Sequence, residues 1–135
     1  MLVREVMTDS VVAVDVGGTV HDAMDAMLGC DVRHIPVIDG ESLRGMVSDR
    51  DIRSLASPKG APGGQGGLMR IDLSMPIVDL MKADVISFQP EDDVEELLEV
   101  MIDYKVGAVP VTNENNTLVG IVSYVDLLRK MREFI

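Results

Sequence analysis

The feature that most constrains the fold of this chain is an internal duplication. The stretch GMVSDRDI at residues 45–52 returns as GIVSYVDL at residues 120–127. Upstream, HIPVID at residues 34–39 matches AVPVTN at residues 108–113, an offset of 74 residues. The opening segment VREVMTDSVVAV matches IVDLMKADVISF at the same offset, and one inserted residue in a turn raises it to 75 for the last motif. Such self-similarity predicts one supersecondary unit used twice, with the two copies packed together.

Each copy contains the same series of predicted elements. A short β-branched strand comes first, then an amphipathic helix that starts at a capping signal, then two strands around a polar turn, and finally a second helix. The strands are predicted at residues 11–14, 34–39 and 43–48 in the first copy, and at residues 85–88, 106–112 and 118–123 in the second. The first helices run from capping signals at Thr19 and Asp93 to about Gly29 and Lys105. The sequence therefore predicts a mixed α/β fold with the unit β-α-β-β-α repeated.

The chain divides into two repeats and a connector. We predict a first repeat at residues 1–56, a linker at residues 57–74 and a second repeat at residues 75–135. The linker contains SPKGAPGGQGG, with five glycines and two prolines in eleven residues, a composition typical of a flexible connector. A glycine-rich phosphate loop would need a strand before it and a Lys-Ser/Thr helix start after it, and neither flank fits.

Charge and composition exclude several classes of protein. A net charge of −11 argues against binding to nucleic acid or to an anionic membrane, both of which need clustered positive charge. The first residues carry charges and lack the apolar run of a signal peptide, and no stretch approaches the roughly 18 apolar residues of a membrane span. Cys30 is the single cysteine, so an internal disulfide is excluded, and no Cys/His set has metal-site spacing. We expect a cytoplasmic protein without a metal site.

The repeated Ser-x-x-Asp motif has two interpretations. Ser48 with Asp51, and Ser123 with Asp126, fit a capping box at the start of a helix, which would fully explain one copy. The motif nevertheless occurs at equivalent positions in both halves, where free N–H groups of a helix start favour a phosphate. An ionised Asp also offers two acceptor oxygens, which suit the two hydroxyls of a ribose. From the residues alone, both a structural and a ligand-binding role remain open.

Two stretches of the sequence, one in each repeat, resemble a known family. RHIPVID followed by LRGMVSDRDI, and VGAVPVTN followed by LVGIVSYVDLL, resemble the two repeats of a cystathionine-β-synthase (CBS) domain pair, or Bateman module. The resemblance implies repeats packed sheet to sheet about a pseudo-twofold axis, with two clefts that commonly bind AMP, ADP, ATP or S-adenosylmethionine. It implies that Asp51 and Asp126 bond a ribose, with Ser48 and Ser123 near the ribose or phosphates. Two such modules often form a homodimer, and no cofactor is required.

The repeats differ where the resemblance implies that phosphates bind. The first repeat offers Arg33, His34 and Arg50, whereas the second has the uncharged residues Gly107, Ala108 and Val125. This asymmetry indicates that one cleft handles phosphates better than the other. Each residue also has a structural alternative, because a histidine beside a strand often makes a structural hydrogen bond and Arg50 can pair with Asp49 at the surface.

The resemblance also implies pocket walls drawn from both repeats. The expected contacts for an adenine ring are Val12, Ile86, Pro36 and Pro110. Each cleft is expected to combine the Asp of one repeat with base contacts from the other. Whether one or both clefts are occupied, and whether Mg²⁺ bridges the phosphates, stays open.

These observations give one leading functional hypothesis and one alternative. The leading hypothesis is a regulatory module that senses adenine nucleotides, or another adenosyl ligand, between the repeats and acts on an effector protein. The alternative is a structural dimerisation module with empty clefts, which would use the apolar stripe of Val125, Leu127, Leu128 and Met131. An enzyme is not expected, because the sequence shows no nucleophile beside a base and no Walker-type loop.

Overall fold

The computed structural model describes residues 1–30, 32–55 and 72–135. The elements, in chain order, are η1 (Val3–Glu5), β1 (Val14–Asp15), α1 (Val20–Cys30), β2 (His34–Asp39), β3 (Ser42–Ser48), α2 (Asp49–Ser54), η2 (Ile77–Asp79), α3 (Val94–Tyr104), β4 (Ala108–Thr112), β5 (Leu118–Ser123) and α4 (Tyr124–Arg132). The predicted helices and the two predicted hairpins are confirmed, with bounds that differ by one or two residues. The glycine-rich part of the predicted linker lies outside the described residues.

The helices begin where the capping signals predict. The backbone N–H of Thr19 donates to Asp22 at 2.9 Å ahead of α1, and the Asp93 side chain accepts from the backbone of Glu95 at 3.0 Å ahead of α3. Capping satisfies backbone donors that have no partner within the helix. Lys105 ends α3 in the left-handed conformation, with φ 54°. None of the helices in the described ranges is long and apolar enough to cross a membrane.

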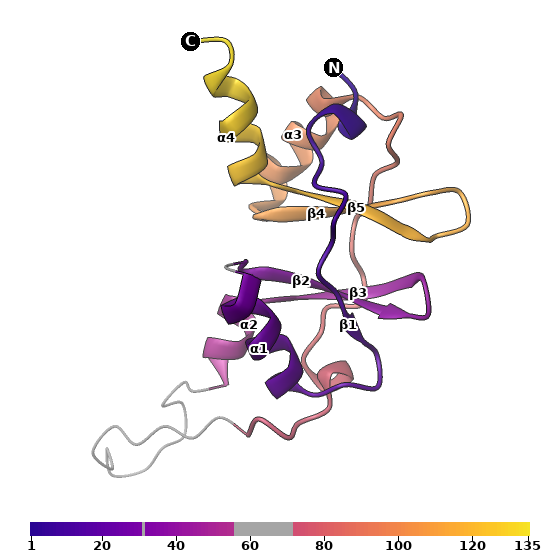
Figure 1. Cartoon of the computed structure of the whole chain (residues 1–135), viewed down its shortest axis with the longest axis vertical. Helices are drawn as coiled ribbons and strands as arrows, with labels where there is room; N and C mark the ends of the chain where they lie inside the picture. The colour runs from indigo at the N-terminus through magenta and orange to yellow at the C-terminus, as the bar shows by residue number, and fades with distance from the viewer. Residues whose placement is uncertain (31, 56–71) are drawn as a thin grey trace.

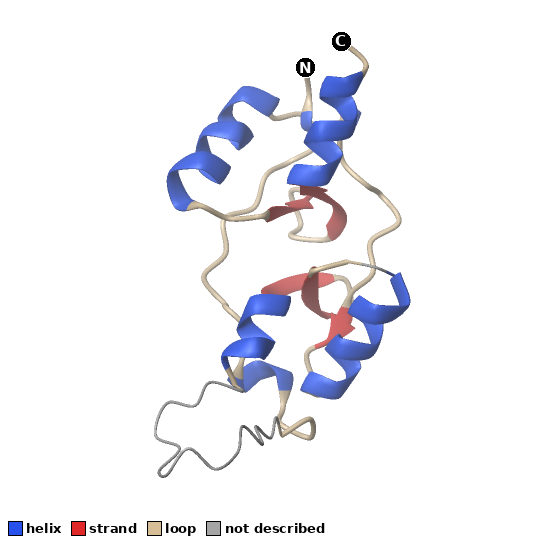
Figure 2. Ribbon diagram, turned by 90° about the vertical axis from the view of Figure 1, so that its left-hand side faces the viewer, coloured by secondary structure: helices blue, strands red, loops and turns tan. Residues whose placement is uncertain are grey.

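The repeats stack in layers, with the sheets inside and the helices outside. Figure 1 shows β2 and β3 facing β4 and β5 across the middle of the molecule, with α1 and α2 at one end and α3 and α4 at the other. Figure 2 shows the same order of layers from the side. Among the described residues, β1, β2 and β3 form one sheet, with β1 parallel to β2, and β4 and β5 form an antiparallel pair.

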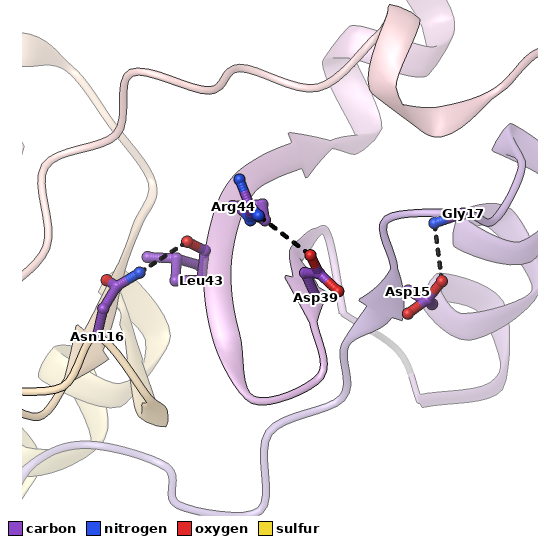
Figure 3. Close-up of polar contacts among 6 residues, drawn as sticks. All are labelled: Asp15, Gly17, Asp39, Leu43, Arg44 and Asn116. Carbon is purple, nitrogen blue, oxygen red and sulfur yellow. Dashed lines mark hydrogen bonds and ion pairs between the residues drawn. The ribbon is translucent and has the colours of Figure 1, made fainter.

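The tips of the two hairpins meet on the pseudo-twofold axis. The N–H of Leu43 donates to the carbonyl of Asn116 at 3.1 Å, and the N–H of Leu118 donates to the carbonyl of Glu41 at 2.9 Å. Leu43 and Leu118 are equivalent in the duplication, as are Glu41 and Asn116, so the two hydrogen bonds are related by the repeat symmetry. The Asn116 side chain adds a further hydrogen bond to the Leu43 carbonyl, at 3.0 Å (Figure 3). The predicted sheet-to-sheet packing is confirmed.

The first strand of each repeat is shorter than predicted. β1 covers Val14 and Asp15, and in the second repeat the pairing is a single bridge between Phe88 and Val111. Phe88 donates to the carbonyl of Pro110 at 3.1 Å and accepts from Thr112 at 2.8 Å. Extending this parallel ladder upstream would require an N–H on Pro110, which proline lacks. Pro36 stands at the equivalent position beside β1 and ends that ladder for the same reason.

Each repeat is completed by a segment from the other. Val3 and Val6 of the N-terminal segment are buried with β4, β5 and α3, whereas Ile77 is buried with β1, β2, β3 and α1. The N–H of Val3 donates to the carbonyl of Asp92 at 2.9 Å, and the equivalent N–H of Ile77 donates to Gly18 at 2.9 Å. Figure 1 shows the N-terminal trace starting beside α3 and crossing to β1. Because this exchange interlocks the two cores, we expect them to unfold together.

Candidate ligand-binding cleft

Both Ser-x-x-Asp motifs act as helix caps. Ser48 accepts the N–H of Asp51 at 3.1 Å, and one carboxylate oxygen of Asp51 accepts the N–H of Ser48 at 2.9 Å. Ser123 and Asp126 make the same reciprocal pair, at 3.3 Å and 2.8 Å. In each motif the capping bond uses Oδ2 of the Asp. The other oxygen, Oδ1, therefore remains for a partner outside the helix.

A cleft of about 670 Å³ opens beside Asp51, between the two repeats. Its walls come from Arg33, β2, β3 and α2 of the first repeat. The second repeat contributes Lys82, residues 84–86, residues 104–109 and Tyr124. The charged residues that line it are Arg33, Asp49, Arg50, Asp51, Arg53, Lys82, Asp84 and Lys105. The volume falls within the range of about 300–1,000 Å³ that is typical of small-molecule sites.

The cleft is locally cationic in an acidic protein. Among the described residues, five cationic side chains and three carboxylates line it. Asp49 forms ion pairs with Arg33 at 3.6 Å and with Arg53 at 3.2 Å, rather than with Arg50 as one interpretation of the sequence suggested. These pairs neutralise the carboxylate that would otherwise repel an incoming phosphate. Within the part of the chain that the structure describes, no group of three or more His, Cys, Asp or Glu side chains could hold a metal ion.

Lys82 is a functional candidate that sequence reasoning missed. Its Nζ atom lies 3.6 Å from Oδ1 of Asp51, and this ion pair joins the second repeat's opening segment to the first repeat. In the duplication, Lys82 is equivalent to Thr8, whose hydroxyl donates to Oδ1 of Asp126 at 3.0 Å. The two Asp residues therefore face equivalent backbone positions, but Asp51 faces an ammonium group and Asp126 a hydroxyl group. The replacement of Thr by Lys in the repeat alignment was the signal available in the sequence.

His34 lies at the contact between the repeats. A Cβ on Gly107 would lie 2.8 Å from the His34 ring, so the glycine allows the imidazole to approach the second repeat. Burial lowers the pKa of His34 below its ordinary 6.5, and Arg33 and Lys82 act in the same direction, while Asp51 and Asp49 partly oppose the change. The imidazole is therefore mainly neutral near neutral pH and can donate or accept a hydrogen bond.

Two aromatic residues, Tyr104 and Tyr124, also line the cleft. Tyr104 is 66% exposed and Tyr124 is 50% exposed, and both side chains can offer a ring face to a flat ligand. The duplication gave no indication of a role for Tyr104, because the equivalent residue of the first repeat is Cys30.

The four residues predicted to form the pocket walls differ in whether they line this cleft. Ile86 lines the cleft and is 44% exposed. Val12 is partly buried against the core of the first repeat. Pro36 and Pro110 are fully buried within β2 and β4 and are not among the described residues that line the Asp51 cleft. The structure thus brings Asp51, Ser48, Arg33, His34, Arg50 and Ile86 together, and it leaves Ser123, Asp126, Val12 and the two prolines outside this cleft.

Comparison with known proteins places both repeats in one family. The family model described as the CBS domain matches residues 3–57 and 77–133. The CBS domain-containing protein YhcV of Bacillus subtilis is 30% identical over 125 residues, a match that covers 93% of this chain and 81% of that protein.

Solved structures share the whole architecture. The AcuB protein of Vibrio cholerae superposes with a TM-score of 0.80 at 26% identity, over 99% of this chain and 92% of that one. The CBS domain pair of protein MJ0100, solved in complex with 5′-methylthioadenosine and S-adenosyl-L-methionine, superposes with a TM-score of 0.81 at 19% identity, over 100% of this chain and 98% of that one. At 19% identity, the likeness to MJ0100 shows a shared fold. These matches extend over both repeats and both sheets.

Proposed function

This chain belongs to the CBS domain family, and we propose that it is a regulatory module that binds an adenine nucleotide in the Asp51 cleft. The observation that carries the proposal is the convergence of the Asp51 carboxylate with five cationic side chains, among the described residues, in a protein of net charge −11. The CBS domain pair of MJ0100 provides support at the level of the fold, because it was solved with two adenosyl ligands.

Each part of a nucleotide has a matching group in the cleft. The Asp51 carboxylate is 16% exposed and keeps Oδ1 outside the capping bond, so it can accept ribose hydroxyls. Arg33, Arg50 and Lys82 can meet phosphates through charge-assisted hydrogen bonds. Tyr104 and Ile86 offer apolar surface to the base. The proposal therefore assigns the ribose to the first repeat and part of the base contact to the second.

A ligand in this position can act as a regulator because it touches both repeats. The cleft walls move relative to one another if the repeats change their angle, and a ligand that binds one arrangement more tightly shifts the population towards it. The output would reach an effector protein, or a second copy of the chain, through the outer helices. Catalysis forms no part of the proposal.

Titration calorimetry with AMP, ADP, ATP and S-adenosylmethionine tests the proposal. We expect at least one nucleotide to bind the wild-type protein, and Asp51→Asn to weaken that binding by about tenfold or more, because a charged hydrogen-bond acceptor is lost. Asp126→Asn makes the same chemical change outside this cleft and should retain binding. An Asn side chain can still accept the Ser48 N–H, so circular dichroism should show that both variants are folded. Absence of heat with all four ligands would contradict the proposal.

A second candidate function is dimerisation through α4. None of the residues of α4, all of which the structure describes, is buried, and Leu128 and Met131 are each 57% exposed. Leu127 packs on the core of the second repeat, so the remaining apolar residues face outward. Light scattering of the wild-type protein and of Leu128→Glu tests this function. A dimer that Leu128→Glu converts to a monomer supports it, and a wild-type monomer contradicts it.

A further inference from the structure

We propose that Lys82 determines the ligand class of the Asp51 cleft, by pairing with Asp51 in the free protein and with a phosphate in the complex. The inference rests on the proposed function and deepens it, because it names the charge that the ligand must carry. The cleft is then selective for an anionic adenosyl compound, such as AMP, over the uncharged nucleoside and over the cationic S-adenosylmethionine.

Backbone hydrogen bonds fix the position of Lys82, whereas its side chain is largely exposed and can change conformation. The backbone of Lys82 is held on β3, with its N–H donating to the carbonyl of Met46 at 2.9 Å and its carbonyl accepting from Met46 at 3.0 Å. The Lys82 side chain is 73% exposed, whereas that of Asp51 is 16% exposed. A lysine has a flexible four-carbon stem, so the ammonium group can turn without any change in the backbone.

A ribose and Lys82 compete for the same acceptor. Lys82 Nζ lies 3.6 Å from Oδ1 of Asp51, which is the oxygen outside the helix cap. A nucleoside that bonds this oxygen displaces the ammonium and offers it no new partner. A nucleotide displaces the ammonium in the same way, but its phosphate supplies a new charged partner that replaces the carboxylate. The ion pair of the free protein therefore penalises the nucleoside more than the nucleotide.

The other repeat contains the same arrangement without the charge. The backbone of Thr8 pairs with Ile121 as that of Lys82 pairs with Met46, with N–H to carbonyl distances of 2.8 and 2.9 Å. The Thr8 hydroxyl, which carries no charge, donates to Asp126 at 3.0 Å. In the repeat alignment, the arginines of α2 that line the Asp51 cleft correspond to apolar residues of α4. The equivalent pairs are Arg50 with Val125 and Arg53 with Leu128. The two Asp residues thus share a backbone frame, but at these three pairs of equivalent positions only the Asp51 side carries cations.

The test is calorimetric titration of AMP and of adenosine into the wild-type protein, Lys82→Thr and Lys130→Thr. Threonine already occupies the equivalent position in the first segment, so Lys82→Thr keeps a backbone arrangement that the fold tolerates. We expect wild-type protein to bind AMP about tenfold or more tightly than adenosine. Lys82→Thr should lower AMP affinity by about tenfold and leave adenosine affinity unchanged or higher. Lys130 pairs with Glu133 and does not belong to the described lining of the cleft, so Lys130→Thr controls for net charge.

The possible outcomes distinguish failure of the role of Lys82 from failure of the proposed nucleotide-binding function. Equal losses of AMP and adenosine binding in Lys82→Thr would overturn the specificity role and leave the nucleotide-binding proposal intact. The same would follow if Lys130→Thr weakened AMP binding as much as Lys82→Thr. If the folded wild-type protein bound neither AMP nor adenosine, the inference would be overturned, and the proposed function would fail as well only if the other three ligands also gave no heat.

Discussion

Substitution of Gly45 by alanine tests how closely the two repeats interlock. Gly45 lies in β3, where the segment that opens the second repeat crosses it. A Cβ at this position would lie 2.6 Å from the carbonyl oxygen of Lys82 and 3.0 Å from the sulfur of Met81. The sulfur ends a flexible side chain and can move. The carbonyl belongs to the backbone and accepts the N–H of Met46 at 3.0 Å, so it can move only by straining that pairing.

The expected cost follows from these contacts. Overpacking a close backbone contact costs about 1–3 kcal/mol, and weakening the paired hydrogen bonds adds about 1 kcal/mol. Alanine recovers about 0.5–1 kcal/mol of backbone entropy relative to glycine in a strand. We therefore expect Gly45→Ala to lower the free energy of unfolding by about 2 kcal/mol, a large part of the stability of a small domain.

Urea denaturation followed by circular dichroism measures the effect, with two graded controls. Gly120→Ala meets the sulfur of Met7 at 2.6 Å and the carbonyl of Thr8 only at 3.2 Å, so a smaller loss of about 1 kcal/mol is expected. Among the described atoms, a Cβ on Gly29 in α1 would meet nothing within 4 Å, so Gly29→Ala should be neutral or stabilising. A stability of Gly45→Ala equal to that of Gly29→Ala would refute the close crossing at β3.

Three further predictions use the same unfolding assay. Ile77→Ala should cost about 3 kcal/mol because the side chain is fully buried in the core of the other repeat. Val78→Ala, at a side chain 44% exposed, should change stability by less than about 0.5 kcal/mol, and equal effects would contradict the burial of Ile77. Ser123→Ala should cost about 1 kcal/mol through the lost cap of α4, and an unchanged urea midpoint would contradict a stabilising cap. His34 should make the protein less stable as the pH falls below 6.5, because burial lowers the pKa of the folded imidazole and the unfolded chain takes up the proton first. His34→Gln should remove this part of the pH dependence, which sets in as the pH falls through 6.5, and identical profiles for the two proteins would contradict it.

The local elements were predictable because their signals are local. The β2–β3 and β4–β5 hairpins each join two apolar runs through a polar turn, and the helices follow capping residues that the structure places in capping bonds. The Ser-x-x-Asp motif shows why both of its interpretations were reasonable. Its Oδ2 atom caps the helix, while its Oδ1 atom faces the other repeat, as the ion pair of Asp51 shows.

The parts that were not predictable depend on contacts between distant segments. An apolar residue such as Val3 or Ile77 indicates burial but not the core that receives it, and the exchange places each of them in the other repeat. The functional candidate Lys82 was missed for the same reason, since its partner lies 31 positions earlier in the sequence and across the repeat boundary. The short first strands follow from Pro36 and Pro110, whose missing donors matter only once the parallel partner is known.

The most direct test of nucleotide recognition in the Asp51 cleft is a crystal structure of the protein with AMP. We predict density for AMP between the repeats, with ribose hydroxyls bonded to Asp51 and with Lys82 turned from its 3.6 Å ion pair towards the phosphate. AMP bound elsewhere, or a Lys82–Asp51 ion pair left in place beside bound AMP, would contradict the assignment of this cleft to an anionic adenosyl ligand.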